Sequence, residues 1–428
     1  MKKAQLASPL SALAQRTQEP AISWLMKMTL DHPNLVSLAA GFTDNSTLPV
    51  QETLELLEEI FSSKKTGQAA LQYGSTAGDA CLRRLTAHDL QAMDNTADQK
   101  VYQHDRVLIT HGSQQLLYLV TECLCNPGDI VLLEDPTYFV YLGILQSHGV
   151  QCRGTPMESD GLDLAALQRT LDTMARSGEL QRVKMLYLVS YFQNPSGITT
   201  SYHKKAAALE LLNFYEKKAG HPIYLLEDAA YRELRFKGDD EPSALSVREY
   251  AERVIYAGTY TKPFATGARV GFGVLPEPVG TAVRRVKGNH DFGTANLLQQ
   301  LLAHAVESGI YERHLALLQR RYAEKAGVMV EAIDKFFPKE VLWEEPRGGL
   351  YVWAKMPRRF KTGERSKIFE TALKKDVLYV PGELCYGLDP TRGKPNHEMR
   401  LSFGGATEEE IRTGIERLGK VLKKTLRA

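Results

Sequence analysis

Six short apolar runs constrain the fold of this 428-residue chain more than any other feature. They lie at residues 107–110, 130–133, 183–189, 223–226, 254–257 and 270–274. Each run follows a polar turn, and uninterrupted apolar runs of this length suit strands that are buried on both faces of a mostly parallel sheet. Helical patterns between them, such as residues 114–125 and 138–147, would cover those faces. The sequence therefore predicts an α/β fold whose large domain has three layers.

The pattern changes on both sides of this region. The N-terminal segment carries several prolines and predicts an irregular arm with one short helix near residues 22–30. Beyond about residue 300 the sequence predicts long helices, two strands at residues 350–353 and 399–403, and a final helix that begins at a capping box of Thr407 and Glu410. The predicted division is an arm at residues 1–46, a large domain at residues 47–305 and a smaller α+β domain at residues 306–428.

Charge and cysteine content exclude several classes of protein. The chain has 53 Lys and Arg against 51 Asp and Glu, so we expect neither nucleic acid nor an anionic membrane as a partner. Its 5 cysteines include no Cys-x-x-Cys pair, so neither a disulfide scaffold nor a zinc site is predicted. The N-terminus lacks the apolar core of a signal peptide, and no apolar run is long enough to span a membrane. We therefore expect a cytoplasmic protein.

Polar residues stand at the carboxyl ends of the predicted strands, where open parallel sheets bind ligands. Gly112, Ser113 and Gln114 follow one strand and open a helix, so their backbone N–H groups form an anion site unless Ser113 serves only as an N-cap. Asp228 ends another strand. A carboxylate buried there is costly unless a cation pairs with it, either a ring nitrogen or an arginine.

Two further segments carry cations. Lys262 lies in a stretch rich in Thr and Gly, and a lysine held in a pocket has a lowered pKa and can act as a nucleophile. Thr259, Thr261 and Arg269 in the same stretch could grip a phosphate. Arg400 interrupts an apolar strand and suits a carboxylate, unless its side chain points outward. A lysine, a carboxylate, a phosphate cradle and a distal arginine together are what a pyridoxal phosphate (PLP) site needs.

The sequence thus resembles the fold-type I PLP enzymes, specifically the class I and II aminotransferases, and within them the 2-aminoadipate and kynurenine aminotransferase branch. The resemblance covers nearly the whole chain. It is carried by residues 71–74, 110–115, 134–138, 193–197, 227–231, 258–271 and 399–402. It implies a large PLP-binding domain, a smaller C-terminal domain and an N-terminal arm that lies over the active site.

The same resemblance implies roles for single residues. Lys262 would form a Schiff base with PLP and move the substrate proton, Asp228 would pair with the pyridine nitrogen, and Tyr231 would bond the phenolic oxygen. Arg400, Asn194 and the backbone near Gly41 would hold the substrate α-carboxylate. The remaining cofactor contacts would be Gly112, Ser113, Gln114, Tyr138, Asn194, Thr259, Thr261, Arg269 and Tyr73 of the partner subunit.

The implied activity is transfer of an amino group between an L-amino acid and a 2-oxo acid. Glutamate and 2-oxoglutarate would be one pair, and the other substrate would be aromatic, aliphatic or 2-aminoadipate. Tyr73 implies a homodimer with shared active sites, and no metal is expected. A PLP-binding regulatory module and another PLP-dependent lyase are the alternatives. Residues 387–394 superficially resemble a P-loop, but the motif is excluded. The spacing of its glycines is one residue too long, and Pro395 stands where Ser or Thr is required.

One departure from the family pattern bears on the substrate. Members that use aminoadipate carry an arginine in the arm, and alignment by eye places Ser23 at that position, which puts an acidic donor in doubt. Arg16 is a candidate to compensate. Trp24 and Phe42 would favour apolar or aromatic side chains if they line the pocket, although Trp24 could instead pack on the body of the protein.

Overall fold

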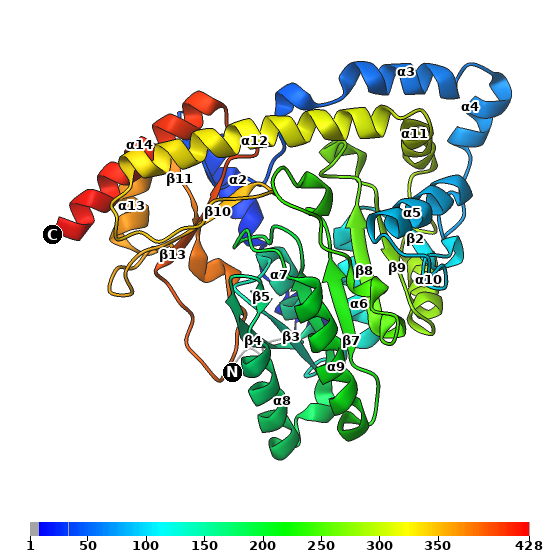
Figure 1. Ribbon diagram of the computed structural model, residues 1–428, viewed down its shortest axis with the longest axis horizontal. Coiled ribbons are helices and arrows are strands. Elements are labelled where there is room, and N and C mark those ends of the chain that lie inside the picture. Colours follow the sequence, from blue (N-terminus) through cyan, green and yellow to red (C-terminus); the bar gives the residue numbers. More distant parts are fainter. Residues whose placement is uncertain (1–7, 33, 428) are drawn as a thin grey trace, which may run out of the picture.

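The computed structural model describes residues 8–32 and 34–427 (Figure 1). Its centre is an 8-stranded sheet with the order β2-β9-β8-β7-β6-β3-β4-β5. Each of the six predicted runs falls on one of these strands, which confirms the α/β fold with a mostly parallel sheet. The strands are β2 (Val107–Thr110), β3 (Ile130–Asp135), β4 (Gln151–Glu158), β5 (Gly161–Leu162), β6 (Val183–Val189), β7 (Tyr224–Asp228), β8 (Val254–Thr259) and β9 (Gly271–Val274).

The direction of the chain through this sheet reverses between β3 and β6. β3 is parallel to both β4 and β6, and β6, β7 and β8 are parallel in turn. The chain passes outward from β3 to β4, and then from β6 through β7 to β8 in the opposite direction. β9 is antiparallel to β8 and β2. Open α/β sheets bind ligands at such a reversal, beyond the carboxyl ends of the strands.

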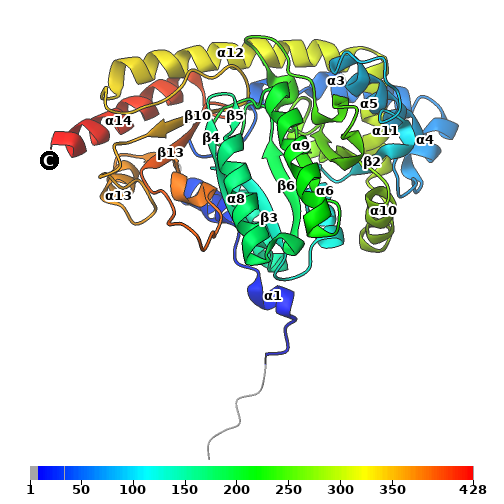
Figure 2. The ribbon, with the colours of Figure 1, turned by 60° about the horizontal axis from the view of Figure 1, so that its bottom comes forward.

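Two groups of helices cover the sheet. α8 (Leu164–Ser177) and α9 (Tyr202–Ala219) pack on each other and lie side by side across the sheet in Figure 2. α6 (Ser113–Leu124) packs on both α7 (Phe139–His148) and α10 (Val279–His290). Right-handed crossovers explain the two groups, because connections that advance in opposite directions along a sheet place their helices on opposite faces.

β4 is a strand that the sequence did not predict. Its residues are mostly polar or small, and it contains Pro156 and Arg153, so it lacks the apolar run that marks the other strands. The Arg153 side chain is nevertheless buried, because its guanidinium pairs with Glu179 at 2.9 Å. Tertiary pairing with β3 along six residues decides the conformation here, overriding local propensity.

The C-terminal part of the chain forms two small sheets with three helices beside them. β10 (Tyr351–Lys355), β13 (Glu398–Ser402) and β12 (Val380–Pro381) form one antiparallel sheet, and β1 (Val36–Ser37) pairs with β11 (Val377–Leu378) in the other. α12 (Ile310–Phe336) lies beside α14 (Glu408–Arg427) and extends toward the large sheet (Figure 1). α13 (Lys367–Leu373) completes this part. The division at residues 305 and 306 stays a prediction.

The predicted capping box begins α14. The Thr407 backbone N–H donates to Glu410 Oε2 at 2.6 Å, and the Glu410 backbone N–H donates to Thr407 Oγ1 at 3.2 Å. This reciprocal pair satisfies two backbone donors that the first turn of a helix leaves free.

The N-terminal segment is more helical than expected. It contains α1 (Ala12–Arg16) and α2 (Ala21–Asp31), the second of which matches the predicted short helix. α3 (Val50–Ile60), α4 (Lys64–Leu71) and α5 (Ala80–Met93) follow this segment, and α11 (Asn296–Glu307) packs on all three of them. Among the described residues, no helix combines the length and apolar character needed to cross a membrane.

A buried ion pair fixes the end of the arm on α12. Asp44 accepts hydrogen bonds from Lys325 Nζ at 2.8 Å and Arg321 Nε at 3.0 Å. Burial raises the pKa of Asp44, but hydrogen bonds from Lys325 and Ser46 outweigh it and lower that pKa to about 2. Lys325 Nζ also donates to the Gly404 carbonyl at 2.7 Å, so the arm and the C-terminal sheet share one buried cation.

The start of β9 packs against the N-terminus of α6 with no room for a side chain. A Cβ at Gly271 would lie 2.4 Å from the Ser113 backbone nitrogen. We expect Gly271→Ala to lower the free energy of unfolding by about 1–3 kcal/mol, the usual cost of overpacking, when measured by urea denaturation.

Gly267→Ala is the matched control, because a Cβ at Gly267 meets nothing within 4 Å. It should stay within about 0.5 kcal/mol of the native protein. Equal destabilisation of the two variants would contradict the close packing at Gly271.

Candidate active site

Five loops meet at the reversal point of the sheet and bring most of the predicted site residues together. Gly112 and Ser113 follow β2, Tyr138 follows β3, and Asn194 follows β6. Asp228 ends β7, and Lys262 lies three residues beyond the end of β8. The parallel strands place their carboxyl ends at one edge, so residues more than a hundred positions apart become neighbours.

Asp228 is a buried carboxylate, and no cation lies beside it in the part of the chain that the structure describes. Tyr187 Oη donates a hydrogen bond to it at 2.9 Å, and the Ala230 backbone N–H donates another at 3.1 Å. Burial raises the pKa of Asp228 to about 6, although these hydrogen bonds oppose the rise. The position therefore favours a ligand that brings positive charge to the carboxylate.

Lys262 is an amine among positive charges. Its Nζ donates to the Gly41 carbonyl at 2.7 Å. Burial lowers the pKa of Lys262 to about 8, and the charges of Arg269 and Arg400 add to the effect. A lysine with such a pKa has a much larger neutral, nucleophilic fraction near neutral pH than an exposed lysine.

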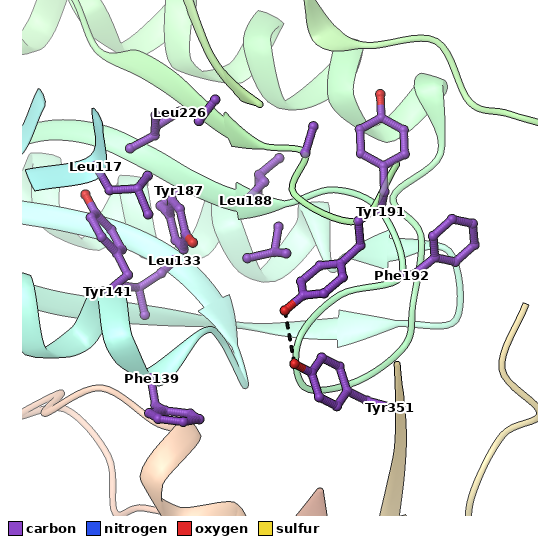
Figure 3. Packing of buried hydrophobic residues seen from close by; sticks show 14 of the residues in the cluster. Leu117, Leu133, Phe139, Tyr141, Tyr187, Leu188, Tyr191, Phe192, Leu226 and Tyr351 are labelled. Atoms are coloured by element: carbon purple, nitrogen blue, oxygen red, sulfur yellow. Dashed lines mark hydrogen bonds between the residues drawn. The ribbon is translucent and has the colours of Figure 1, made fainter. Parts of the chain in front are cut away.

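A chain of hydrogen bonds joins Arg400 to Tyr351 across three parts of the fold. Arg400 donates to Asn194 Oδ1 at 2.7 Å, and Asn194 Nδ2 donates to Tyr231 Oη at 3.3 Å. Tyr231 and Tyr351 share a hydrogen bond at 3.1 Å, drawn as a dashed line at Tyr351 in Figure 3. Arg400 is only 1% exposed and also donates to the Ala39 carbonyl at 2.6 Å. It therefore points inward, as expected.

The predicted anion cradle is assembled from two segments. Gly112 precedes α6 with φ 75°, and a Cβ there would lie 2.8 Å from the Arg269 guanidinium and 3.8 Å from Thr261 Oγ1. Thr261 Oγ1 is buried and has no hydrogen-bond partner among the described residues. Thr259 Oγ1 instead donates to the Val270 carbonyl at 3.2 Å and accepts from the Thr261 N–H at 3.0 Å. Backbone donors, a guanidinium and a free hydroxyl converge here, as an anion requires.

Arg269 carries a sign of function in its backbone. Its φ of 52° and ψ of 40° lie in the left-handed region, which is uncommon for a residue other than glycine. Such conformations persist only where the surrounding structure enforces them, and they concentrate at binding sites.

A cavity of about 840 Å³ opens beside these groups. Gln114 and Tyr138 line it together with the arm, the length of α7, the start of β4 and the loop after Leu384. Burial raises the pKa of Tyr138 above its ordinary value, and the charge of Asp228 adds to the rise while Arg400 opposes it. Tyr138 thus faces both the cavity and the charged centre.

The arm supplies part of the cavity wall. Ser23 lines the cavity. Arg16 does not compensate for it there, because Arg16 Nε donates to the Ser147 carbonyl at the end of α7 at 3.1 Å. Trp24 stacks on Phe369 of α13 at 6.0 Å, so it packs on the body of the protein. Phe42 is about half exposed and contacts the Gly404–Gly405 turn.

Tyr73 lies on a different surface. Its side chain is 83% exposed, and its ring packs edge-on against Phe292 at 5.4 Å. A depression of about 530 Å³ lies there between residues 70–74 and 291–297. The structure of the single chain therefore does not bring Tyr73 to the residues around Lys262.

Three site residues were missed by sequence reasoning. Tyr187 bonds Asp228, Tyr351 bonds Tyr231, and the guanidinium of Arg400 lies 4.3 Å from the Tyr351 ring centre. Glu134 is fully buried and accepts hydrogen bonds from Gln193 Nε2 at 2.6 Å and the Val189 N–H at 2.8 Å, which holds the loop that carries Asn194. Glu134 lies in the segment 134–138, which the sequence analysis did single out. The two tyrosines lie in apolar strands, where a tyrosine has the pattern of an ordinary core residue.

The site contains no candidate metal centre. Among the described residues, no group of three or more His, Cys, Asp or Glu side chains could hold a metal ion.

Comparisons with known proteins identify relatives along nearly the whole chain. A family model described as aminotransferase class I and II matches residues 33–418. The chain is 31% identical over 419 residues to aromatic-amino-acid aminotransferase 1 of Thermococcus litoralis, covering 97% of this chain and 94% of that protein.

Two solved structures are similar to this chain over 98% of its length and over 98% of the length of their own chains. One is the kynurenine aminotransferase of Pyrococcus horikoshii in complex with PMP, at 31% identity and a TM-score of 0.87. The other is the α-aminoadipate aminotransferase of Thermus thermophilus complexed with N-(5'-phosphopyridoxyl)-L-leucine, at 31% identity and a TM-score of 0.82.

The raised pKa of Asp228 predicts a stability effect in the ligand-free protein. The pKa is about 6 when folded and 3.8 in the reference state, so the charged carboxylate destabilises the fold. This penalty is full above pH 6 and disappears as the pH falls toward 4. Asp228→Asn should therefore stabilise the ligand-free protein by on the order of 3 kcal/mol at pH 7 and far less at pH 4. Urea denaturation at both pH values measures it, and a pH-independent difference would contradict it.

Proposed function

Because the chain belongs to the class I and II aminotransferases, which move an amino group between an amino acid and a 2-oxo acid, we propose that Lys262, Asp228 and Arg400 form its reaction centre. The observation that carries this proposal is that a buried acid and a half-buried amine lie at one edge of the sheet, each without an oppositely charged partner among the described residues. Asp228 is a carboxylate without a counter-ion, and Lys262 is an amine with a lowered pKa.

The residues at the site fit PLP. A protonated ring nitrogen would supply the cation that the buried Asp228 lacks. A phosphate would satisfy the partnerless Thr261 hydroxyl and the guanidinium of Arg269 at the N-terminus of α6. We propose that Gly112, Ser113, Gln114, Thr259, Thr261 and Arg269 hold the phosphate, and that Tyr138, Asn194 and Tyr231 hold the ring.

Each proposed catalytic group has a definite task. When bound, PLP supplies an electron sink that stabilises negative charge at the substrate Cα. Arg400 binds the α-carboxylate of the amino acid, a role for which its forked guanidinium is suited. Lys262 Nζ removes the proton from Cα as a general base, since its lowered pKa leaves it partly neutral. Asp228 keeps the proton on the ring nitrogen.

Asn194 links these tasks. Its side-chain oxygen accepts from Arg400, and its side-chain nitrogen donates to Tyr231. These two hydrogen bonds connect the proposed carboxylate-binding guanidinium to the tyrosine that we place on the phenolic oxygen. The Gly41 carbonyl, which accepts from Lys262, marks where the arm meets the reaction centre.

We also propose a homodimer in which Tyr73 completes the site of the partner subunit. Tyr73, Leu71 and Phe292 are all exposed, and Val50 and Leu54 expose further apolar surface on α3. α3 and α4 lie at the same end of the molecule as α10 (Figures 1 and 2). Apolar surface gathered in this way is typical of a protein interface.

The test of the reaction centre is a spectral titration of the purified protein loaded with PLP. We expect a visible band that disappears on addition of glutamate and returns on addition of 2-oxoglutarate. Borohydride should then fix the cofactor to the peptide that contains Lys262. Lys262→Ala should lose this linkage and all turnover, because the substitution removes the reacting amine. Turnover in Lys262→Ala, or a band that no amino acid changes, would overturn the proposal.

The shared active site can be tested by mixing two defective variants. Lys262→Ala lacks the amine, and Tyr73→Ala lacks the contact that we assign to the partner's site. In a mixed dimer one site combines the intact Lys262 of one chain with the intact Tyr73 of the other. Activity should therefore rise above the sum of the separate variants after co-refolding. A mixture of Lys262→Ala and Asp228→Asn is the control. Both residues act within one chain, so every site in that mixed dimer lacks either the lysine or the aspartate. Its activity should therefore not rise above the sum of the separate variants.

A further inference from the structure

The loop of residues 387–394, which resembled a P-loop only superficially, is anchored to the large sheet. Asp389 Oδ2 accepts from the Gly154 backbone N–H at 3.0 Å, and Asp389 Oδ1 accepts from the Thr391 N–H at 2.8 Å. Arg392 pairs with Asp135 at the end of β3, and its guanidinium lies 5.4 Å from the Tyr386 ring centre. The loop therefore has a defined position beside the end of β3 and the middle of β4.

This anchoring brings Lys394 to the cavity of about 840 Å³ beside the reaction centre. Lys394 is the only Lys, Arg or His among the described residues that line that cavity, and Glu19 is the only carboxylate. Lys394 has no described carboxylate within 4.0 Å, and the charge of Glu383 reaches it only through space. Its ammonium group is thus available to an anion that enters the cavity.

The cavity and the reaction centre share a wall. Phe139 lines the cavity, and its ring centre lies 5.3 Å from the guanidinium of Arg400. On the other side, the Thr137 N–H donates to the Cys385 carbonyl at 2.8 Å, which joins the segment before Lys394 to the segment before Tyr138. Cys385 lies close enough to Arg400 and Lys394 for both charges to oppose the burial-driven rise in the pKa of its thiol.

We propose that Lys394 is a specificity-determining residue that binds the distal carboxylate of a dicarboxylic substrate such as glutamate or 2-oxoglutarate. The inference rests on the proposed function, in which Arg400 binds the α-carboxylate. Arg400 and Lys394 both lie near Cys385, and a substrate with two carboxylates would use two such cations. The arm cannot supply this charge, because Ser23 is neutral and Arg16 is bonded to the Ser147 carbonyl.

The same cavity also suits substrates without a second carboxylate. Its arm and α7 walls carry Ile22, Leu142 and Ile144, and its far wall carries Leu384 and Leu388. A neutral side chain can lie against these apolar surfaces while Lys394 stays in water, since it is exposed at its loop. One site can therefore accept an acidic substrate in one half-reaction and a neutral substrate in the other. This is possible because Lys394 lies at the edge of the cavity rather than at its centre.

The test compares binding of two non-reacting acids to the PLP-loaded protein by calorimetry. Glutarate carries two carboxylates, and pentanoate carries one on a chain of the same length. Lys394→Ala should weaken glutarate binding on the order of tenfold, the loss expected for one charged hydrogen bond, and leave pentanoate unchanged. kcat/KM for glutamate should fall by a similar factor, whereas that for leucine should not. Lys394→Arg should restore most of the glutarate affinity.

Lys339→Ala is the matched control for loss of one positive charge, since Lys339 is exposed beyond the end of α12. It should change neither acid's affinity. Equal losses for glutarate and pentanoate in Lys394→Ala, or no loss for either, would overturn the assignment of Lys394. If the native protein transaminates no amino acid, the proposed function is wrong instead. The binding of glutarate and pentanoate can be measured whether or not the protein has this activity.

Discussion

The buried guanidinium of Arg400 is the interaction on which the arrangement of the site depends. It donates to Asn194 on the loop after β6 and to the Ala39 carbonyl in the arm, while its own strand belongs to the C-terminal sheet. Removing a charge from water costs several kcal/mol unless hydrogen bonds and neighbouring groups compensate. Arg400 therefore stays buried only while all three segments are in place, so the fold and the position that we propose for carboxylate binding are formed together.

The remaining electrostatics leave the ligand-free site unbalanced. Among the described residues, Asp228 has no cation beside it, Arg269 and Lys262 have no carboxylate, and the Thr261 hydroxyl has no partner. Each of these groups costs folding free energy when the site is empty of ligand. A ligand that is cationic at its ring and anionic at its phosphate compensates all of them at once, and its binding to the folded state alone would stabilise the fold.

Much of the site was predictable because its residues follow strands in recognisable segments. Lys262, Asp228, Asn194 and Arg400 were all assigned from the sequence, and the structure brings them to one edge of the sheet. Tyr187 and Tyr351 were not, because a tyrosine in an apolar strand has the same local pattern whether it packs in the core or donates to a neighbour. For Trp24 the sequence left open whether it lines the pocket or packs on the body of the protein, and its stacking on Phe369 shows that it packs.

The sequence by itself determined the parallel sheet, most of its strands and the chemical types of the reacting groups, because apolar runs and strand-end residues are local features. Only the tertiary structure decided that β4 is a strand, that the sheet reverses between β3 and β6, and that Lys394 lines the same cavity as Tyr138. These follow from pairing between segments far apart in the chain. Local sequence carries no record of which distant partner will bury a polar strand or anchor a charged loop.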